Sequence, residues 1–362
     1  MPLLSTQPRS AVDNCRNGRP PTGTIAGMPA DPAPFPTEIR IAPYRTVLNR
    51  GSTGRLIGLD PETAVAIDHL PPPLAEMIDE LEATAPTADL LARAVHRGAT
   101  QDEAENVLRT LLRAGVVVDA ARSGRRTARR ASSRVLVLGN GPVGCGVATG
   151  LARAGVGDIQ VLMRGRVGVG DLGTGLVNAH TGRALGDAVV DAVRRLAPNV
   201  RCSTTNALSQ EVDLVVLADT LAVHPARLAI LNADAVPYLP VRLRDGIGVV
   251  GPLVLPGRSA CFGCLDRHRR DRDALWPTVA AQLIDRPGTG APVAATAVAA
   301  LGTAQALLAL DEPEMSPPPT LNATLELDVT CGTLVRRRWS PRPDCGCGAR
   351  LGVTTRTRRA QS

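Results

Sequence analysis

The sequence predicts an α/β protein built on a doubly wound, Rossmann-like and mostly parallel sheet, with a winged-helix (α+β) domain before it. From Arg134 onward, buried apolar strands alternate with helical segments, which is typical of such a sheet. The first of these strands runs into a glycine-rich turn that opens a helix. Before Ala120, three amphipathic helical segments accompany a short β-hairpin, which indicates a winged helix. At 362 residues the chain has room for both domains.

The first 120 residues divide into two parts. Residues 1–43 are rich in Pro, Gly and Ser and lack a periodic apolar pattern, so we expect a disordered N-terminal segment. Residues 44–120 are expected to form the winged-helix domain. Its strands are expected at Thr46–Asn49 and Leu56–Leu59, on either side of a Gly-Ser-Thr-Gly turn, and at Val116–Val118.

The helices of this domain are predicted from apolar side chains that recur three, four and seven residues apart. The third helix begins at Thr100, which with Glu103 has the sequence of a capping box. The apolar positions are Leu74, Met77, Ile78 and Leu81, then Leu90, Leu91, Ala94 and Val95, and finally Val107, Leu108, Leu111 and Leu112.

The remainder of the chain is expected to hold one domain between two polar segments. Residues 121–133 are predicted to be an Arg-rich linker, residues 134–349 the sheet domain, and residues 350–362 a disordered tail. The expected strands of the sheet domain are Val135–Leu138, Ile159–Met163 and Leu214–Leu217, and its expected helices include Val147–Ala154, Val189–Leu196 and Ala291–Leu310.

The segment Ala291–Leu310 carries no charge over twenty positions, which is long enough to span a bilayer. Its residues are mainly Ala, interrupted by Thr, Gln and Gly, and no aromatic residues flank it as they flank membrane helices. We therefore expect a buried helix packed on the sheet and no membrane insertion.

Charge and composition limit the partners. The net charge of +7 and a pI near 9.4 suit an acidic partner, but the arginines concentrate in the predicted linker and tail. Aromatic residues make up 2% of the chain, too few for a base-stacking surface, so we expect no nucleic-acid partner. The N-terminus lacks the apolar stretch of a secretory signal, and we expect a cytoplasmic protein.

The chain contains no lysine, so all 41 of its basic residues are Arg. This absence excludes a P-loop lysine, a Schiff-base lysine and any lysine that holds a phosphate.

The turn after the first strand of the sheet domain contains Gly139, Gly141 and Gly144 in a G-x-G-x-x-G pattern. Between a strand and a helix, such a turn places phosphate against backbone N–H groups at the helix N-terminus. An NAD site also needs a carboxylate at the end of the second strand for the ribose hydroxyls, and none is present there. Arg164 stands at that place, so an NADP site, with Arg164 on the 2′-phosphate, remains open as an alternative.

Four cysteines form two close pairs, Cys261 with Cys264 and Cys345 with Cys347, each interrupted by glycine. Two thiolate pairs on tight turns can close a tetrahedral four-sulfur zinc site. All four ligands would come from the protein, so we predict a structural zinc. A redox-active C-x-x-C pair and simple buried thiols are the alternatives.

Together these motifs resemble the ThiF/MoeB group of ubiquitin-like-modifier-activating enzymes. The resemblance rests on the stretch Leu136–Arg166, on Gly251-Pro252-Leu253, on Cys261–Asp273 (CFGCLDRHRRDRD), and on the helix from Ala291. It implies a domain that binds MgATP, adenylates the C-terminal carboxylate of a small carrier protein and holds a structural zinc on the four cysteines.

The chain departs from that family's pattern where the nucleotide would bind. Met163-Arg164-Gly165 replaces the ribose-binding D-x-D, and the stretch 170–175 lacks the family's Arg and Gln. The phosphate-binding lysine is absent, with Arg183 the nearest cation, while Asp219 matches the Mg²⁺-binding aspartate. These departures predict a degenerate nucleotide site.

The N-terminal domain resembles PqqD-like leader-peptide-recognition elements, and its union with a ThiF-like domain resembles the ocin-ThiF-like proteins of azoline-forming pathways. This resemblance implies a protein that binds a ribosomal precursor peptide and presents it to a YcaO-type cyclodehydratase. The leader would add as a strand at Val116–Val118 or at the hairpin near Leu56–Leu59, beside the helix Gln101–Arg113. The alternative is an active ATP-dependent adenylyltransferase for a ubiquitin-like or sulfur-carrier protein. Relatives of this kind commonly form homodimers.

Overall fold

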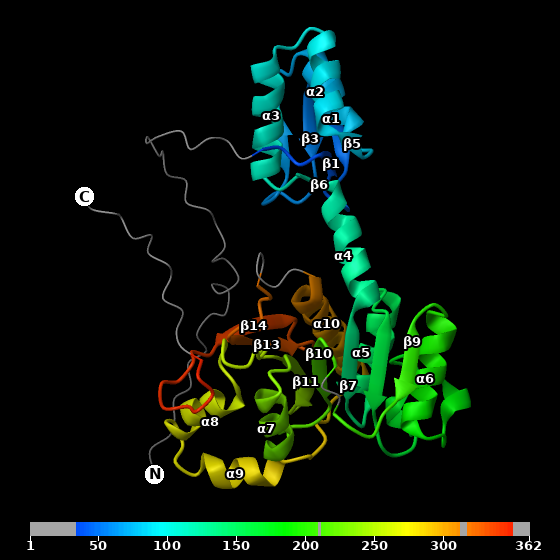
Figure 1. Ribbon diagram of the computed structural model, residues 1–362, viewed down its shortest axis with the longest axis vertical. Coiled ribbons are helices and arrows are strands. Elements are labelled where there is room, and N and C mark those ends of the chain that lie inside the picture. Colours follow the sequence, from blue (N-terminus) through cyan, green and yellow to red (C-terminus); the bar gives the residue numbers. More distant parts are fainter. Residues whose placement is uncertain (1–33, 209–210, 312–316, 350–362) are drawn as a thin grey trace, which may run out of the picture. The chain divides into compact units, whose positions relative to one another are not determined.

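The computed structural model describes residues 34–208, 211–311 and 317–349, which fall into two compact units (Figure 1). The N-terminal unit ends at Ala128, and the unit with the large sheet begins at Arg129. Residues 1–33 of the expected disordered segment and the expected tail 350–362 lie outside the described residues. Within 34–43 the expectation of disorder is wrong, because Glu38–Ile41 forms strand β1 and buries Ile39 and Ile41 in the N-terminal core.

From residue 34 to the start of α4 at Ala120, the N-terminal unit contains two three-stranded sheets and three helices. Strand β1 lies between β5 (Ala85–Pro86) and β6 (Val117–Asp119), and β3 (Gly54–Ile57) lies between β2 (Val47–Arg50) and β4 (Val65–Ile67). The helices are α1 (Pro72–Glu80), α2 (Thr87–His96) and α3 (Gln101–Arg113). The predicted hairpin and all three predicted helices are present, while the winged-helix assignment itself stays an interpretation.

The predicted capping box at the start of α3 is confirmed. The backbone N–H of Glu103 donates to Thr100 Oγ1 at 3.3 Å, and the backbone N–H of Thr100 donates to Glu103 Oε2 at 2.9 Å. Both bonds satisfy N–H groups that would otherwise lack a partner at the helix N-terminus.

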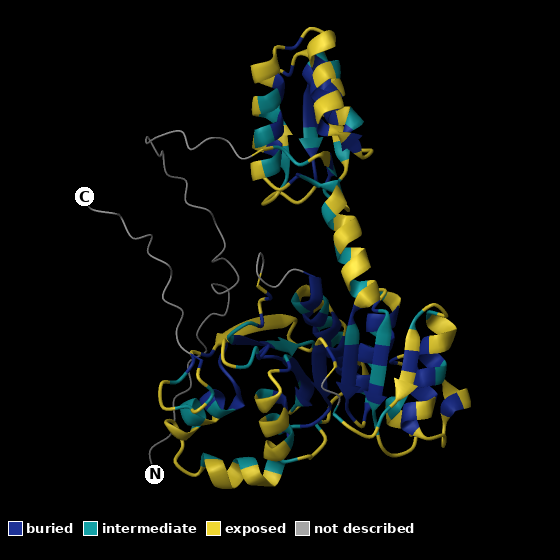
Figure 2. Ribbon diagram, viewed as in Figure 1, coloured by how far each residue is buried: buried dark blue, intermediate teal, exposed yellow. Residues whose placement is uncertain are grey.

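The predicted linker 121–133 is helical, because α4 spans Ala120–Ser132. Alanine and arginine are strong helix formers, and Asp119 accepts the backbone N–H of Ala121 at 2.9 Å. The helix buries none of its own residues, as its exposed surface in Figure 2 illustrates. Near its end, Arg130 makes a two-bond ion pair with the buried carboxylate of Asp311, at 2.7 and 2.5 Å.

An eight-stranded sheet forms the second unit, in the order β14-β13-β12-β11-β10-β7-β8-β9. The strands from β11 to β9 run parallel, and β12, β13 and β14 add to them antiparallel. The prediction of a doubly wound, mostly parallel sheet is confirmed. The strands are β7 (Arg134–Leu138), β8 (Asp158–Leu162), β9 (Arg201–Thr204), β10 (Leu214–Ala218), β11 (Tyr238–Arg244), β12 (Ile247–Val250), β13 (Ala323–Asp328) and β14 (Thr333–Arg338).

Helices cover both faces of this sheet (Figure 1). Helices α5 (Pro142–Arg153), α6 (Leu185–Leu196) and α10 (Pro292–Asp311) share one core with the sheet. On the opposite face, α7 (Pro225–Ala233) and α8 (Phe262–Arg270) share a second core, and the exposed helix α9 (Trp276–Leu283) follows α8. Because side chains alternate along a strand, β11 supplies Val241 to the first core and Tyr238 to the second.

Helix α10 is the expected buried helix. By length and composition alone it could cross a membrane, but Ala295, Val298 and Gly302 are buried where it packs on α5, β11 and β12. Small residues bring α5 and α10 very close together. A Cβ atom at Gly146 would lie 2.7 Å from the Cβ of Ala299, and one at Gly150 would lie 2.7 Å from Thr303 Oγ1.

Candidate functional site

The glycine-rich turn lies where the sequence predicts it, between β7 and α5. Its three glycines are required by a neighbouring carboxylate. A Cβ atom at Gly139 would lie 2.5 Å from Asp219 Oδ2, and Cβ atoms at Gly141 and Gly144 would lie 2.9 Å from an oxygen of the same carboxylate. The structure therefore brings Asp219, which directly follows β10, against the turn.

The carboxylate of Asp219 accepts three backbone hydrogen bonds from the turn. Oδ2 accepts the N–H of Gly141 at 3.0 Å and that of Gly144 at 3.1 Å, and Oδ1 accepts the N–H of Val143 at 3.0 Å. These N–H groups lie at the N-terminus of α5, where a helix favours negative charge. The groups that would bind a phosphate are thus bonded to a side chain of the chain itself.

Asp219 is held in an unfavourable setting. Its side chain is 5% exposed, and its backbone has a φ of 68°, a left-handed conformation that is uncommon outside glycine. Burial raises the pKa of Asp219 to about 6, although the three N–H bonds favour the ionised form. A buried carboxylate in a strained backbone persists because its surroundings hold it there.

A small cavity of about 180 Å³ lies beside the turn, at the carboxyl end of β7. Sites for cofactors usually measure about 300 to 1,000 Å³, so this space is small for a nucleotide. Arg164 lines it where a ribose-binding acid would stand, and its backbone N–H donates to Asn140 Oδ1 at 2.8 Å. Asp285 also lines the cavity, but it pairs with Arg227 at 3.0 Å. No motif in the sequence marks Asp285.

Arg183 is not placed as a phosphate ligand. Its guanidinium donates to Asp191 Oδ2 at 3.0 Å, and the same oxygen accepts a bond from Arg195 at 2.8 Å. Asp191 belongs to α6, and the nearby His180 ring completes the cluster at 3.2 Å from Asp191. The predicted site residues therefore divide: Gly139, Gly141, Gly144 and Asp219 lie together, while Arg183 is held by its own ion pair.

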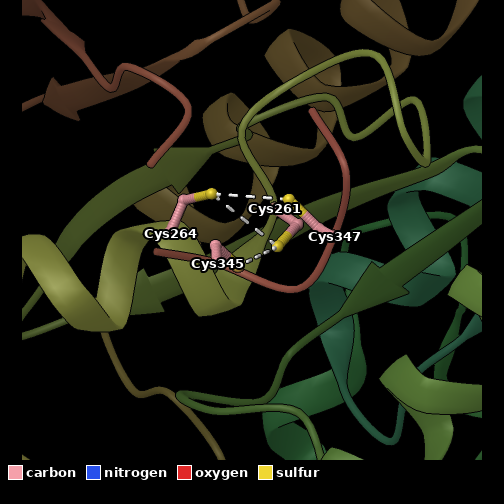
Figure 3. Close-up of side chains that lie close together, drawn as sticks. All are labelled: Cys261, Cys264, Cys345 and Cys347. Atoms are coloured by element: carbon pink, nitrogen blue, oxygen red, sulfur yellow. Dashed lines mark hydrogen bonds between the residues drawn. The ribbon is translucent and has the colours of Figure 1, made fainter. Parts of the chain in front are cut away.

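The four paired cysteines converge as predicted (Figure 3). Their sulfurs lie within 4.8 Å of one another, with Cys261 Sγ 3.7 Å from Cys345 Sγ and Cys264 Sγ 3.7 Å from Cys347 Sγ. With metal–sulfur bonds of about 2.3 Å, the edge of a tetrahedron is about 3.8 Å. The cluster can therefore hold a metal ion in tetrahedral thiolate coordination.

The surroundings of this cluster suit a metal held by thiolates. Burial and the neighbouring cysteines raise the pKa of Cys261, so its thiolate needs a cation to persist. Two N–H groups point at the sulfurs: the backbone N–H of Arg342 lies 3.3 Å from Cys264 Sγ, and Arg267 Nη1 lies 3.6 Å from Cys345 Sγ. Such donors stabilise thiolate ligands and fix their orientation.

A much larger cavity, of about 900 Å³, opens among α7, α8 and α9 on the same side of the sheet as the cysteine cluster. Phe262 and Gly263, between the first two cysteines, form part of its wall. The sequence reasoning missed it. The available signal was a pair of charged residues, Arg242 and Arg244, at the end of the otherwise apolar strand β11.

Comparisons with known proteins agree with this architecture. The chain is 27% identical over 147 residues to the molybdopterin-synthase adenylyltransferase of Escherichia coli (strain K12). That match covers 37% of this chain and 59% of the relative, so the chain spans little more than half of that protein's length.

Solved structures share the fold over most of the chain. Escherichia coli MccB in complex with MccA-N7isoASN superposes with a TM-score of 0.66 at 16% identity, covering 86% of this chain and 100% of that one. The complex of E. coli MccB with ATP gives 0.65 at 17% identity, covering 86% and 99%. PaaA gives 0.57 at 14% identity, covering 82% and 99%. Because the ThiF family model matches residues 119–349, well over half of the sequence, the chain belongs to the ThiF family.

Proposed function

We propose that this ThiF-family protein binds a ribosomal precursor peptide and presents it to a modifying enzyme, without adenylating the peptide. The observation that carries the proposal is the Asp219 carboxylate on the N–H groups of Gly141, Val143 and Gly144. A triphosphate would have to displace a buried anion from those groups. Catalysis of phosphoryl chemistry also requires cations at the phosphates; the chain has no lysine, and Arg183, the expected substitute, is paired with Asp191.

A peptide as the ligand is supported by the fold. MccB, whose fold this chain shares over 86% of its length, is described as a microcin C7 biosynthetic enzyme in complex with N-formylated MccA. That similarity extends beyond the ThiF match into the N-terminal unit. There, β6 lies at the edge of its sheet beside α3, and β2 lies at an edge of the hairpin sheet, so each offers a strand edge to an extended peptide. Strand β3, which carries Leu56, lies between β2 and β4 and offers no edge. A YcaO-type cyclodehydratase as the receiving enzyme, and a homodimeric assembly, remain predictions from the family resemblance.

The proposal is tested by measuring peptide binding and nucleotide chemistry on the same preparation. We expect a precursor peptide to bind by isothermal titration calorimetry without ATP, and deletion of residues 1–120 to remove that binding. We expect no ATP–pyrophosphate exchange above background with or without the peptide. Exchange that depends on the peptide would overturn the proposal, and so would peptide binding that requires ATP.

The second candidate function is an active adenylyltransferase. It is favoured by the turn itself, because three N–H groups that converge on one anion form a site that a phosphate can use. MccB has also been solved with ATP on the same fold. In this case Asp219 would leave the turn when ATP binds and would hold Mg²⁺ instead. Peptide-dependent exchange in the wild type, lost in D219A, is the result that would favour this function.

We also propose that Cys261, Cys264, Cys345 and Cys347 hold a structural zinc ion. Four thiolates fill a tetrahedral shell, so the ion would crosslink the start of α8 to residues 345–347 and leave no position for a substrate. Metal analysis of the purified protein should find about one equivalent of zinc per chain. A protein that is free of metal and equally stable would contradict this assignment.

A further inference from the structure

The large cavity has the size and lining of a ligand site. Its volume of about 900 Å³ lies within the range of sites for small molecules. The walls from α7, α9 and the loop after β10 are largely apolar, and they include Leu221, Leu228, Ala229, Pro277 and Ile284. All of the lining residues belong to the unit that begins at Arg129 and contains the eight-stranded sheet.

Arg242 lines this cavity with a buried charge that lacks an ionic partner. Its side chain is 3% exposed, and among the described residues it makes no hydrogen bond or ion pair. The guanidinium carbon lies over the ring of Phe262, 5.9 Å from the ring centroid. A buried charge costs several kcal/mol unless it is paired, so an anion bound in the cavity would stabilise this guanidinium.

Of the four other arginines of the lining, Arg270 is exposed to solvent and the other three already have partners. Arg244 pairs with Glu326 at 3.3 Å, Arg269 pairs with Asp266 at 3.3 Å, and Arg267 donates to the carbonyl of Gly263 at 3.1 Å. Asp266 is further engaged by the indole N–H of Trp276 at 3.0 Å.

The neighbouring charges do not offset the burial of Arg242. Burial and repulsion from Arg269 and Arg244 lower the pKa of Arg242 to about 9, against the smaller opposing effect of Glu326 and Asp266, so it stays charged at neutral pH. Five arginines and two aspartates line the cavity, and Asp245, the acid without a recorded partner, is exposed to solvent. The cavity as a whole therefore carries an excess of positive charge.

We propose that this cavity binds an organic carboxylate with an apolar body, whose carboxylate pairs with Arg242 and whose apolar part lies against α7 and α9. A planar guanidinium matches a carboxylate through two parallel hydrogen bonds. A neutral apolar ligand would contact the apolar walls of the cavity but would leave Arg242 unpaired. This inference does not depend on what the glycine-rich turn binds, because the turn and the cavity have separate linings.

The proposal is tested with small probes that differ in one group. Octanoate and octanol share an apolar chain, and acetyl-Ala-Ala-Leu can be compared as free acid and as amide. By isothermal titration calorimetry on the full chain, we expect at least one of the acids to bind ten or more times more tightly than its neutral counterpart. We expect R242M to remove that preference and R258M, an equal charge change at an exposed residue outside the lining, to keep it.

Each outcome decides the question. Binding of octanoate alone identifies a free acid as the ligand, and binding of the tripeptide acid alone identifies a peptide C-terminus. Acids that bind no better than octanol and the amide overturn the proposal, as does a preference that survives in R242M. If R242M does not fold, R242Q replaces it, and the wild-type comparison of acid with amide needs no variant.

Discussion

The glycine-rich turn and the cavity at Arg242 are both built for an anion, yet they differ in how that requirement is met. At the turn, the chain supplies its own carboxylate, and Asp219 bonds to three N–H groups. In the cavity, the charged group is equally buried and has no acidic partner among the described residues. Buried polar groups normally have hydrogen-bond partners. We therefore expect an added anion to bind more readily in the cavity than at the turn.

This difference reverses the reading that the motifs favour. At the glycine-rich turn, which has the nucleotide motif, the N–H groups are already bonded to Asp219. On strand β11, which carries no motif, the guanidinium of Arg242 has no ion pair among the described residues. Four predictions test that contrast, beginning with the cysteine cluster, whose first pair flanks one wall of the cavity.

The double variant C261S/C264S should have the largest effect. Loss of the metal would free α8 and the 345–347 loop, and it should cost on the order of 4–5 kcal/mol of unfolding free energy. Hydrogen exchange should show protection lost over 261–270 and 339–349, with the turn at 139–144 still protected. C331S, at an exposed cysteine outside the cluster, is the matched control and should behave as the wild type. Equal loss of protection at the turn would mean that the two sites are one cooperative element.

D219A should leave the N–H groups of the glycine-rich turn without their acceptor. Removing the carboxylate leaves three N–H groups for an added anion, so inorganic phosphate at 100 times its dissociation constant should stabilise the variant by about 2.7 kcal/mol. The wild type should gain far less at the same concentration, as measured by urea unfolding. If phosphate stabilises both proteins equally, Asp219 does not block the turn.

R242M should stabilise the free protein by about 1–2 kcal/mol, because it replaces an unpaired buried charge with an apolar chain of similar length. Urea unfolding without added ligand measures this change. A loss of stability of the same size would show that Arg242 has a partner within the chain, and the contrast between the sites would fail.

R183A should change stability by no more than about 0.5 kcal/mol, since the ion pair with Asp191 is largely exposed to solvent. Thermal unfolding and ATP–pyrophosphate exchange should both match the wild type. A variant that loses a nucleotide-dependent activity would restore Arg183 as the substitute for the missing lysine.

Much of the second unit could be predicted from its sequence, because its strands are continuous apolar runs and its turn has a fixed glycine spacing. The strands β7, β8 and β10, the start of α5 and the convergence of the cysteine pairs all follow from local patterns. Strand β1 was missed, because only two isoleucines mark it in a proline-rich stretch. Helix α4 was read as a linker, since arginine-rich segments are polar whether helical or not.

The candidate sites were harder to predict because they depend on distant residues. Asp219 lies 75 residues or more from the N–H groups that it satisfies, and only the pairing of β10 with β7 brings them together. The sequence predicts a degenerate nucleotide site because the family's motif residues are absent. Their absence does not predict that the Asp219 carboxylate bonds to the turn. The cavity is lined by α7, by the end of β11 and by α8 and α9, and these segments come together only in the folded unit, so no spacing in the sequence indicates it.

The close approach of α5 and α10 makes the turn sensitive to changes far from it. Gly146 and Gly150 lie on one side of α5, four residues apart, with Ala299 and Thr303 directly opposite. A methyl group at either glycine would wedge the two helices apart. Because α5 begins at the turn, the same displacement would shift the N–H groups relative to Asp219. The accessibility of these N–H groups to an added anion would therefore depend on the spacing of two helices, at positions that lie outside the turn itself.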